Sequence, residues 1–184
     1  WNTSSLGVSP KPGVHHVRKA TIAGELIYDV RYTIGDNGFR ITPGVERHAR
    51  EPRVNFLGCS GTFGEGLNDD QTLAAQIQQR LQQAQLHNLA MSGYGMHQAL
   101  ALLEDSARTP GKVNVVLTAP WHAERSACVP SFATGSPRYV LQADGGVVRD
   151  GVCGGPVQPL ARVLSWSRVW GLIKAIVARK NQDA

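Results

Sequence analysis

The sequence predicts an α/β fold in which helices cover a parallel sheet. Short apolar, β-prone segments at 54–57, 86–90 and 113–119 predict three strands, and amphipathic segments between them predict helices. A strand, helix, strand, helix, strand order at this spacing is typical of parallel strands joined by crossovers. With 184 residues, 42% of them hydrophobic, the chain can bury one full core.

The region before this core is predicted to be mainly extended. Residues 1–20 are rich in Ser, Pro, Gly and His without periodicity, which indicates an extended lead-in. Residues 26–34 alternate apolar with mostly polar side chains, which predicts a strand with one buried face. The turn signal at 35–38 would let 39–42 return as the partner strand of a small hairpin. We therefore predict an N-terminal region of residues 1–52 and a core of residues 53–184.

Each core element has its own signal. In the first helix, Leu73, Ile77 and Leu81 recur every four residues and predict the buried face. A second helix is predicted from about 96 to 107, and 113–119 is apolar and β-branched enough to be buried on both faces of the sheet. The candidates for the cap of the first helix are Asn68, Asp69 and Asp70.

The C-terminal third is loop-rich up to about residue 158. Within it, 138–142 and 147–149 predict a hairpin across the turn at 144–146. Residues 160–179 predict a final helix with an apolar stripe, for which core packing is favoured over a partner surface or a membrane-surface helix. No apolar run approaches the roughly 20 residues that a membrane span needs.

Composition narrows the classes of partner. The net charge is +5 and the isoelectric point about 9.4, but the basic residues are scattered and not interleaved with aromatics. This pattern favours a solvated surface over nucleic-acid binding. The histidines and cysteines show no metal-ligand spacing, so neither zinc nor another cofactor is predicted.

Two features concern processing and compartment. Cys128 and Cys153 flank one loop-rich stretch, and they either pair in an oxidising compartment or remain two thiols. The chain starts at Trp1 and not at Met, so we expect that a native N-terminus has been removed. The cell envelope, export and the cytoplasm all stay open as locations, and so does the oligomeric state.

The most informative segment is the Gly-rich turn after the first core strand, at 56–66. It has four glycines in nine positions, at the end of the sheet where α/β folds bind ligands. A phosphate site is disfavoured because the turn has no Lys, and Glu65 with the two downstream aspartates would repel a pyrophosphate. The nucleophile elbow of α/β-hydrolases fits less well still, because Thr62 replaces its last Gly.

The run Gly58-Cys-Ser-Gly-Thr-Phe-Gly64, followed by a Gly, an acidic pair and a helix, resembles block one of the SGNH/GDSL hydrolases. Asn88-Leu-Ala-Met-Ser-Gly-Tyr-Gly95 resembles block two at the right distance. Tyr28-Asp-Val-Arg-Tyr32 is similar to the β lead-in of one bacterial branch, and Arg138-Tyr-Val-Leu141 to a segment after its third strand. In all, roughly residues 25–180 can be laid on this family.

The resemblance implies a three-layer α/β/α fold of flavodoxin-like type and a serine esterase that needs no cofactor. Ser60 would be the nucleophile, and the backbone N–H groups of Ser60 and Gly93 would hold the oxyanion. One such donor is typically worth ~3–4 kcal/mol in the transition state.

The sequence departs from the family pattern at two positions and in one missing block. Cys59 replaces the Asp beside the nucleophile, and His122 stands where block three offers an Asn. His122 is interpreted as an oxyanion donor, as a base for Ser60 or as a histidine packed beside Trp121. The Asp-x-x-His block is absent, so either the chain continues past residue 184 with a histidine that moves the proton, or another base serves, or the protein is not a catalyst. We favour the first, because three core strands are fewer than the five of this fold.

The sequence therefore predicts a Ser60 acyl-enzyme that hydrolyses or transfers a short acyl group, such as acetyl, on a carbohydrate or lipid. Arg125 would hold an anionic substrate group or pair with a surface acid. The main alternative is a non-catalytic SGNH-like module that binds a glycan or a partner protein. A nucleotide-binding α/β domain is the third hypothesis.

Overall fold

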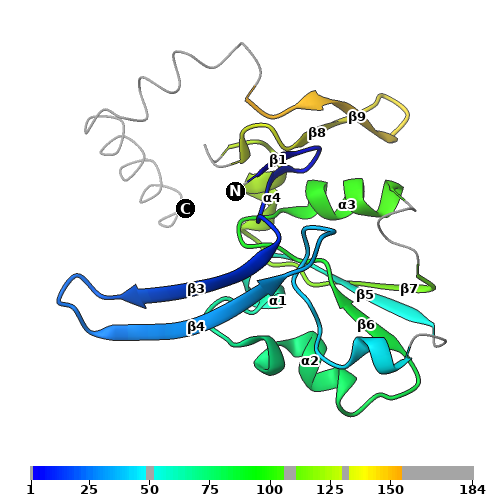
Figure 1. The fold of residues 1–184 in the computed structure, drawn as a ribbon. Helices are drawn as coiled ribbons and strands as arrows, with labels where there is room; N and C mark the ends of the chain where they lie inside the picture. Colours follow the sequence, from blue (N-terminus) through cyan, green and yellow to red (C-terminus); the bar gives the residue numbers. More distant parts are fainter. Residues whose placement is uncertain (1, 49–51, 106–110, 130–132, 155–184) are drawn as a thin grey trace, which may run out of the picture. The chain divides into compact units, whose positions relative to one another are not determined.

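The computed structural model describes residues 2–48, 52–105, 111–129 and 133–154. The chain divides into a unit of Trp1–Cys153 and a unit of Gly154–Ala184, and everything below concerns the first. The helix predicted at 160–179 lies outside the described residues. The described part combines a parallel sheet with antiparallel hairpins and a few helices, which confirms the α/β class (Figure 1).

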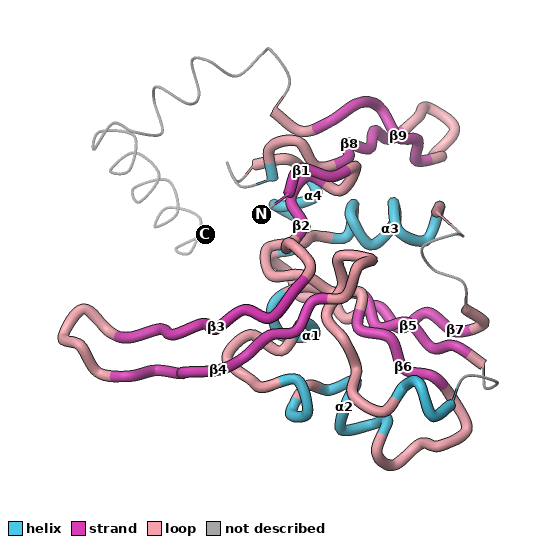
Figure 2. Tube along the Cα trace, in the orientation of Figure 1, coloured by secondary structure: helices cyan, strands magenta, loops and turns pink. Residues whose placement is uncertain are grey.

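A three-stranded parallel sheet forms the centre of this unit. Its order is β6-β5-β7, with β5 at Arg53–Leu57, β6 at Gln85–Asn88 and β7 at Val113–Val116 (Figure 2). Phe56 lies opposite Asn88 on one neighbour and Val115 on the other. The three strands therefore end at one edge, and the segments that follow them meet there.

Both faces of this sheet carry buried side chains. Successive residues of a strand point to opposite faces, and Phe56 and Leu57 belong to different core clusters. Leu57 packs with residues of α3 (Met96–Glu104), and Phe56 packs with Ala74 of α2 (Leu73–Gln78). In Figure 1, α2 and α3 accordingly lie on opposite sides of the sheet.

The buried face predicted for the first helix is confirmed for Ile77, which packs against the core, but is wrong for the two leucines. Leu73 and Leu81 are 39% and 40% exposed, and α2 instead buries Ala74, Ala75 and Gln78. The two alanines allow close approach to the sheet, and the Gln78 amide satisfies backbone groups beside β6 by donating to Ala84 O and accepting from Leu86 N.

The start of this helix also differs from the prediction. Asn68 caps a short 3-10 turn, η2 (Asp69–Gln71), and the Thr72 hydroxyl caps α2 by accepting from the Ala75 N–H at 3.3 Å. Of the three predicted cap residues, Asn68 is thus a cap, but of the turn that precedes the helix. The N-cap of α2 itself is a threonine, a residue type that suits this position.

The burial predicted for the third strand is also wrong. Val113 is 49% exposed and Leu117 is 36% exposed, although both are apolar. Among the described strands, β7 stands at the end of the order and pairs with β5 along one side. An apolar β-branched run predicts the strand, but the neighbours that cover it decide its burial.

The lead-in before the core is more structured than predicted. Gly13–Ala20 form β3, which pairs antiparallel with β4 (Leu26–Ile34), and β1 (Asn2–Ser4) pairs with β2 (Gly7–Ser9). The strand predicted at 26–34 is confirmed; its longer partner is β3, and its end also pairs with the predicted return segment, 39–42, where the Ile41 N–H donates to the Thr33 carbonyl at 3.0 Å. The latter segment contributes isolated bridges in which Arg40 links Ile34 to Asn88 of β6. Because β3 is mostly exposed, backbone pairing defines it and hydropathy does not reveal it.

After β7, the predicted hairpin is confirmed, but it is preceded by a short helix where a loop was predicted. α4 spans His122–Ser126, and β8 (Pro137–Leu141) pairs with β9 (Val147–Val152) as the expected hairpin. Cys128 and Cys153 form a disulfide, which settles that alternative. The short helix η1 covers Val45–His48.

Candidate active site

The Gly-rich turn carries the predicted nucleophile to the end of the sheet. β5 runs through Gly58 and Cys59 into the short helix α1 (Ser60–Phe63), which Ser60 begins. A Cβ on Gly58 would collide with the Thr62 side chain and lie 3.0 Å from the Leu117 carbonyl oxygen. Glycine is therefore required for the tight reversal that presents Ser60, which is half-buried.

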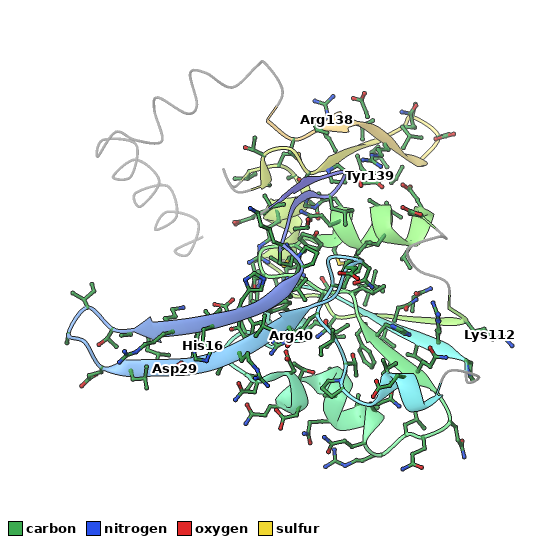
Figure 3. The ribbon with its side chains drawn as sticks, viewed as in Figure 1. His16, Asp29, Arg40, Lys112, Arg138 and Tyr139 are labelled. Carbon is green, nitrogen blue, oxygen red and sulfur yellow. A yellow bond between two sulfur atoms is a disulfide. The ribbon has the colours of Figure 1, made fainter. Side chains whose placement is uncertain are left out.

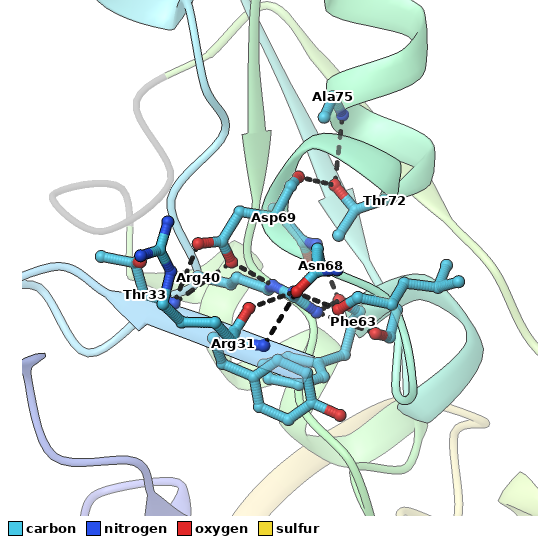
Figure 4. Close-up of polar contacts among 12 residues, drawn as sticks. Arg31, Thr33, Arg40, Phe63, Asn68, Asp69, Thr72 and Ala75 are labelled. Carbon is cyan, nitrogen blue, oxygen red and sulfur yellow. Dashed lines mark hydrogen bonds and ion pairs between the residues drawn. The ribbon is translucent and has the colours of Figure 1, made fainter. Parts of the chain in front are cut away.

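Arg40 fixes the loop that follows Ser60 (Figure 4). Its guanidinium is buried and donates to the carbonyl oxygens of Phe63, Gly64 and Leu67 at 3.0, 2.8 and 2.6 Å. Its Nε bonds Asp69 Oδ1 at 2.9 Å. Burial lowers the pKa of Arg40, and the Asp69 carboxylate counteracts this by favouring the charged form.

Arg40 lies in the segment predicted only as the return strand 39–42, and this role was missed. Arg40 connects Asp69, one of the predicted cap residues, to three carbonyls of the loop after Ser60. It lies where the β3–β4 hairpin meets the core, whereas His16 and Asp29 lie farther out on that hairpin (Figure 3). The sequence did offer a signal. An arginine inside an otherwise apolar, strand-like segment needs a buried acidic partner, and acidic residues follow it in the chain.

The second predicted motif is tied directly to the first. Asn88, at the end of β6, is 1% exposed, and its Nδ2 donates to the carbonyls of Thr62 and Phe63 at 3.1 and 3.3 Å. Its Oδ1 accepts from the Ala90 N–H at 3.2 Å. Asn88 thus locks α1 to the loop that contains Gly93. Gly93 has a φ of +90°, a left-handed conformation that favours glycine.

Ser60 and Gly93 line the same cavity, whose volume is about 400 Å³. Arg125 of α4 and Glu65 from the loop after α1 line it as well. The structure therefore brings together two of the three predicted site residues. It also gives Arg125 a place beside them, where its Nη1 donates to the Tyr94 carbonyl at 3.0 Å.

A second cavity of about 410 Å³ adjoins the first, because Glu65, Met91 and Ser92 line both. The β3–β4 hairpin supplies its other wall, with the rings of Tyr28 and Tyr32. Glu65 accepts from Ser92 Oγ at 3.0 Å and from Tyr28 Oη at 3.4 Å. Burial, with Tyr32 and Glu65 nearby, raises the pKa of Tyr28 to about 12, so Tyr28 is a hydrogen-bond donor near neutral pH.

The third predicted residue, His122, lies beneath the turn. It begins α4, is 3% exposed and packs edge-on to Trp121 with ring centroids 6.0 Å apart. Its Nδ1 lies 3.2 Å from the Ala119 nitrogen and 3.1 Å from Thr118 Oγ1, and its Nε2 lies 2.9 Å from Cys59 Sγ. Burial and the positive charge of Arg125 lower the pKa of His122, which favours the neutral ring.

Cys59, predicted only as a departure from the family pattern, lies at the centre of the buried contacts beneath the turn. The thiol is 8% exposed, and its Sγ lies 3.8 Å from Ser60 Oγ as well as close to His122. Burial raises the pKa of Cys59, but the Gly61 backbone, the Ser60 hydroxyl and Arg125 outweigh it, so the net shift is downward. The sequence could have indicated the contact between Cys59 and His122, because each follows one of two neighbouring parallel strands and such residues meet at one edge of the sheet.

His97 forms a separate buried junction. It is 3% exposed, and its ring nitrogens lie 3.3 Å from Ser126 Oγ and 2.9 Å from Ser136 Oγ. Burial lowers the pKa of His97 to about 4. This histidine therefore joins α3 to α4 and to the segment before β8 as a neutral side chain.

Within the described ranges, no group of three His, Cys, Asp or Glu side chains could hold a metal ion. No helix in the same ranges is both long and apolar enough to cross a membrane. A comparison with protein-family models finds no match for this sequence, and a search of curated proteins finds no significant match. The function must therefore be argued from the site itself.

Proposed function

We propose that this chain is an acyl-ester hydrolase or acyltransferase of SGNH type that acts through a Ser60 acyl-enzyme. The observation that carries the proposal is that Ser60 and Gly93, from two different turns at one sheet edge, line a single cavity. The flavodoxin-like α/β/α architecture belongs to the same proposal. It is supported by the parallel order β6-β5-β7 with helices on both faces.

In this mechanism Ser60 Oγ attacks the ester carbonyl and forms the acyl-enzyme, which water or an acceptor alcohol then cleaves. The backbone N–H groups of Ser60 and Gly93 stabilise the oxyanion. The anchors at Arg40 and Asn88 support this role, because they fix both turns before substrate binds. His122 acts on the site through Cys59, since its Nε2 lies 2.9 Å from that sulfur.

The two adjoining cavities suit an ester with a small and a larger side. A short acyl group fits the cavity at Ser60, and the alcohol, a carbohydrate or lipid, extends along the hairpin over Tyr28 and Tyr32. The rings supply apolar surface, and Glu65 supplies a polar contact at the shared border.

The test is hydrolysis of a panel of p-nitrophenyl acyl esters by the intact chain, by Ser60→Ala and by Ser92→Ala. Ser92 is the matched control because it lines the same cavity but hydrogen-bonds Glu65. We expect Ser60→Ala to reduce kcat to background and Ser92→Ala to keep most of it. Equal rates for the intact chain and Ser60→Ala would end the assignment.

A non-catalytic glycan- or protein-binding module is the second candidate. The observation that favours it is the position of His122, which contacts Cys59 and not the Ser60 hydroxyl. That candidate predicts no turnover of any ester and saturable binding of a glycan that Tyr28→Ala abolishes. Turnover that depends on Ser60 would exclude it.

A further inference from the structure

The hydrogen bonds around His122 determine which ring nitrogen carries the hydrogen. The Ala119 backbone N–H can only donate, so Nδ1, 3.2 Å away, must present its lone pair. The Thr118 hydroxyl, 3.1 Å away, can donate to the same nitrogen. A neutral imidazole with a bare Nδ1 carries its hydrogen on Nε2, which faces Cys59 Sγ at 2.9 Å. His122 is therefore a donor to the sulfur and does not accept its proton.

The sulfur of Cys59 has further donors around it. The Gly61 backbone approaches it from α1, and the guanidinium of Arg125 approaches it from α4 with a positive charge. Burial alone would favour the neutral thiol, but these groups favour the thiolate and lower the pKa of Cys59. N–H donors beside a cation are the surroundings in which cysteine thiolates form in proteins.

The positions of the two neighbouring side chains separate their roles. Ser60 lines the cavity, whereas Cys59 is 8% exposed and lies under the turn, so a bound ester meets the hydroxyl first. Cys59 Sγ lies 3.8 Å from Ser60 Oγ, a distance that catalytic hydrogen bonds commonly show before substrate binds.

Building on the acyl-transfer function proposed above, we propose that Cys59 is the general base of this site and that His122 and Arg125 hold it as a thiolate. Cys59 touches the reacting hydroxyl and is a catalytic residue, whereas His122 is a positioning residue that acts through the sulfur. The positive charge of Arg125 compensates the negative charge of the thiolate.

The proton and the electron pairs balance without any further reagent. The Ser60 O–H bond breaks, an S–H bond forms on Cys59, and Oγ bonds the carbonyl carbon, whose π electrons move to the oxygen. On collapse, the bond to the alcohol oxygen breaks, and the S–H proton passes to that oxygen. In the second half, the thiolate takes a proton from water, which attacks the acyl carbon, and the proton returns to Ser60 Oγ.

The pH dependence follows from the groups that face Cys59. His122 and Arg125 face it from α4, the Ser60 hydroxyl and the Gly61 backbone face it from α1, and Glu65 lines the same cavity as Ser60. Because the thiolate is the active form, kcat/KM falls as the pH drops through the pKa of this thiol. The lowered pKa places that fall below the ordinary cysteine value of 9.0.

The first experiment needs no variant. Cys59 is the only free cysteine, because Cys128 and Cys153 are paired and the chain has three. The ultraviolet absorbance of a thiolate, followed against pH in the folded chain and corrected for tyrosinate by the separate tyrosinate band at longer wavelength, therefore titrates Cys59. We expect a midpoint below 9.0 that coincides with the acid limb of kcat/KM. A midpoint at or above 9.0, or an acid limb elsewhere, would overturn the proposal.

The second experiment compares Cys59→Ser, Cys59→Asp and His122→Gln, with circular dichroism to establish that each folds. We expect Cys59→Ser to lower kcat by about 10²–10⁴-fold with KM little changed, because a hydroxyl is a poor base near neutral pH. Cys59→Asp should recover part of that loss with an acid limb moved to lower pH. His122→Gln should raise the thiol midpoint.

The variants test the base role of Cys59 separately from the nucleophile role of Ser60. If Ser60→Ala abolishes turnover while folded Cys59→Ser keeps the full rate, Ser60 is the nucleophile and the Cys59 proposal is refuted. An acyl group found on Cys59 by peptide mapping would also refute it, because the thiol would then be the nucleophile. If Ser60→Ala stays fully active, the esterase assignment itself fails.

Discussion

At the scale of single residues, Arg40 supports the candidate site although no sequence motif identifies it. It is buried, pairs with Asp69 and donates to three carbonyls in the nucleophile loop. Its guanidinium also lies 4.4 Å from the Tyr32 ring centroid and 5.0 Å from that of Phe63. A motif search cannot find such a residue, because its partners lie 23 to 29 positions away.

Replacement of Arg40 by Met should lower the free energy of unfolding by about 3–5 kcal/mol, because Asp69 and three carbonyls lose a buried partner. The matched control is Arg138→Met, since Arg138 pairs with Asp150 on the surface. That change should cost less than about 1 kcal/mol. Urea unfolding followed by circular dichroism measures both. Equal losses would show that the Arg40 network is not a major support of the fold.

Gly93 can be tested against a glycine of the same conformation elsewhere. Gly93 and Gly24 have φ of +90° and +87°, but Gly24 lies in the β3–β4 turn with open space around it. Replacement by Ala should cost each about 1 kcal/mol of stability, because of the left-handed backbone. Only Gly93→Ala should reduce kcat, by about 10-fold or more as the oxyanion donor shifts. A normal kcat for folded Gly93→Ala would remove Gly93 from the site.

At the scale of elements, the sequence predicts which strands and helices form better than it predicts which of them pair or pack together. β4, the parallel strands and the β8–β9 hairpin follow from periodicity and turn residues, whereas β3 was missed because its side chains are mostly exposed. The face of α2 was predicted correctly only at Ile77, because small residues and a glutamine, not leucines, make the buried contact with the sheet. Hydropathy records what a side chain prefers, but a close helix–sheet contact selects for size.

The junction of α3, α4 and the segment before β8 depends on a neutral His97. The pKa of His97 is about 4 in the folded chain against an ordinary value of 6.5, so the unfolded chain binds the extra proton between these values. The free energy of unfolding should therefore fall by about 3 kcal/mol as the pH drops from 6.5 to 4. His97→Gln should flatten this dependence in denaturant titrations at a series of pH values. An unchanged slope in the variant would contradict this assignment.

The disulfide fastens the end of α4 to the end of β9 across 25 residues. A cross-link over such a loop restricts the unfolded chain and stabilises the fold by about 3 kcal/mol. The double variant Cys128→Ser, Cys153→Ser should lose that amount in urea unfolding and should keep the Cys59 thiol titration unchanged. A loss below about 1 kcal/mol would mean that the cross-link contributes little.

At the scale of the whole molecule, the sequence predicts which edge of the sheet carries the candidate site more reliably than it predicts which side chains contact one another there. The Gly-rich turn and the 88–95 loop follow parallel strands, so Ser60 and Gly93 could be expected near one point, and they do line one cavity. The pairing of Cys59 with His122 across 63 positions depends on which side chains turn beneath the surface, and periodicity does not carry that information. The division at residue 52 and the substrate class stay predictions.

The most direct test of the central claim is covalent labelling of the folded chain with a fluorophosphonate, followed by peptide mapping by mass spectrometry. An activated serine in an acyl-transfer site forms a stable adduct with this reagent. We predict one adduct, on Ser60, which is absent after heat denaturation and absent in Ser60→Ala. A folded chain that takes no label, or takes it on a residue outside the cavity shared by Ser60 and Gly93, would contradict the account.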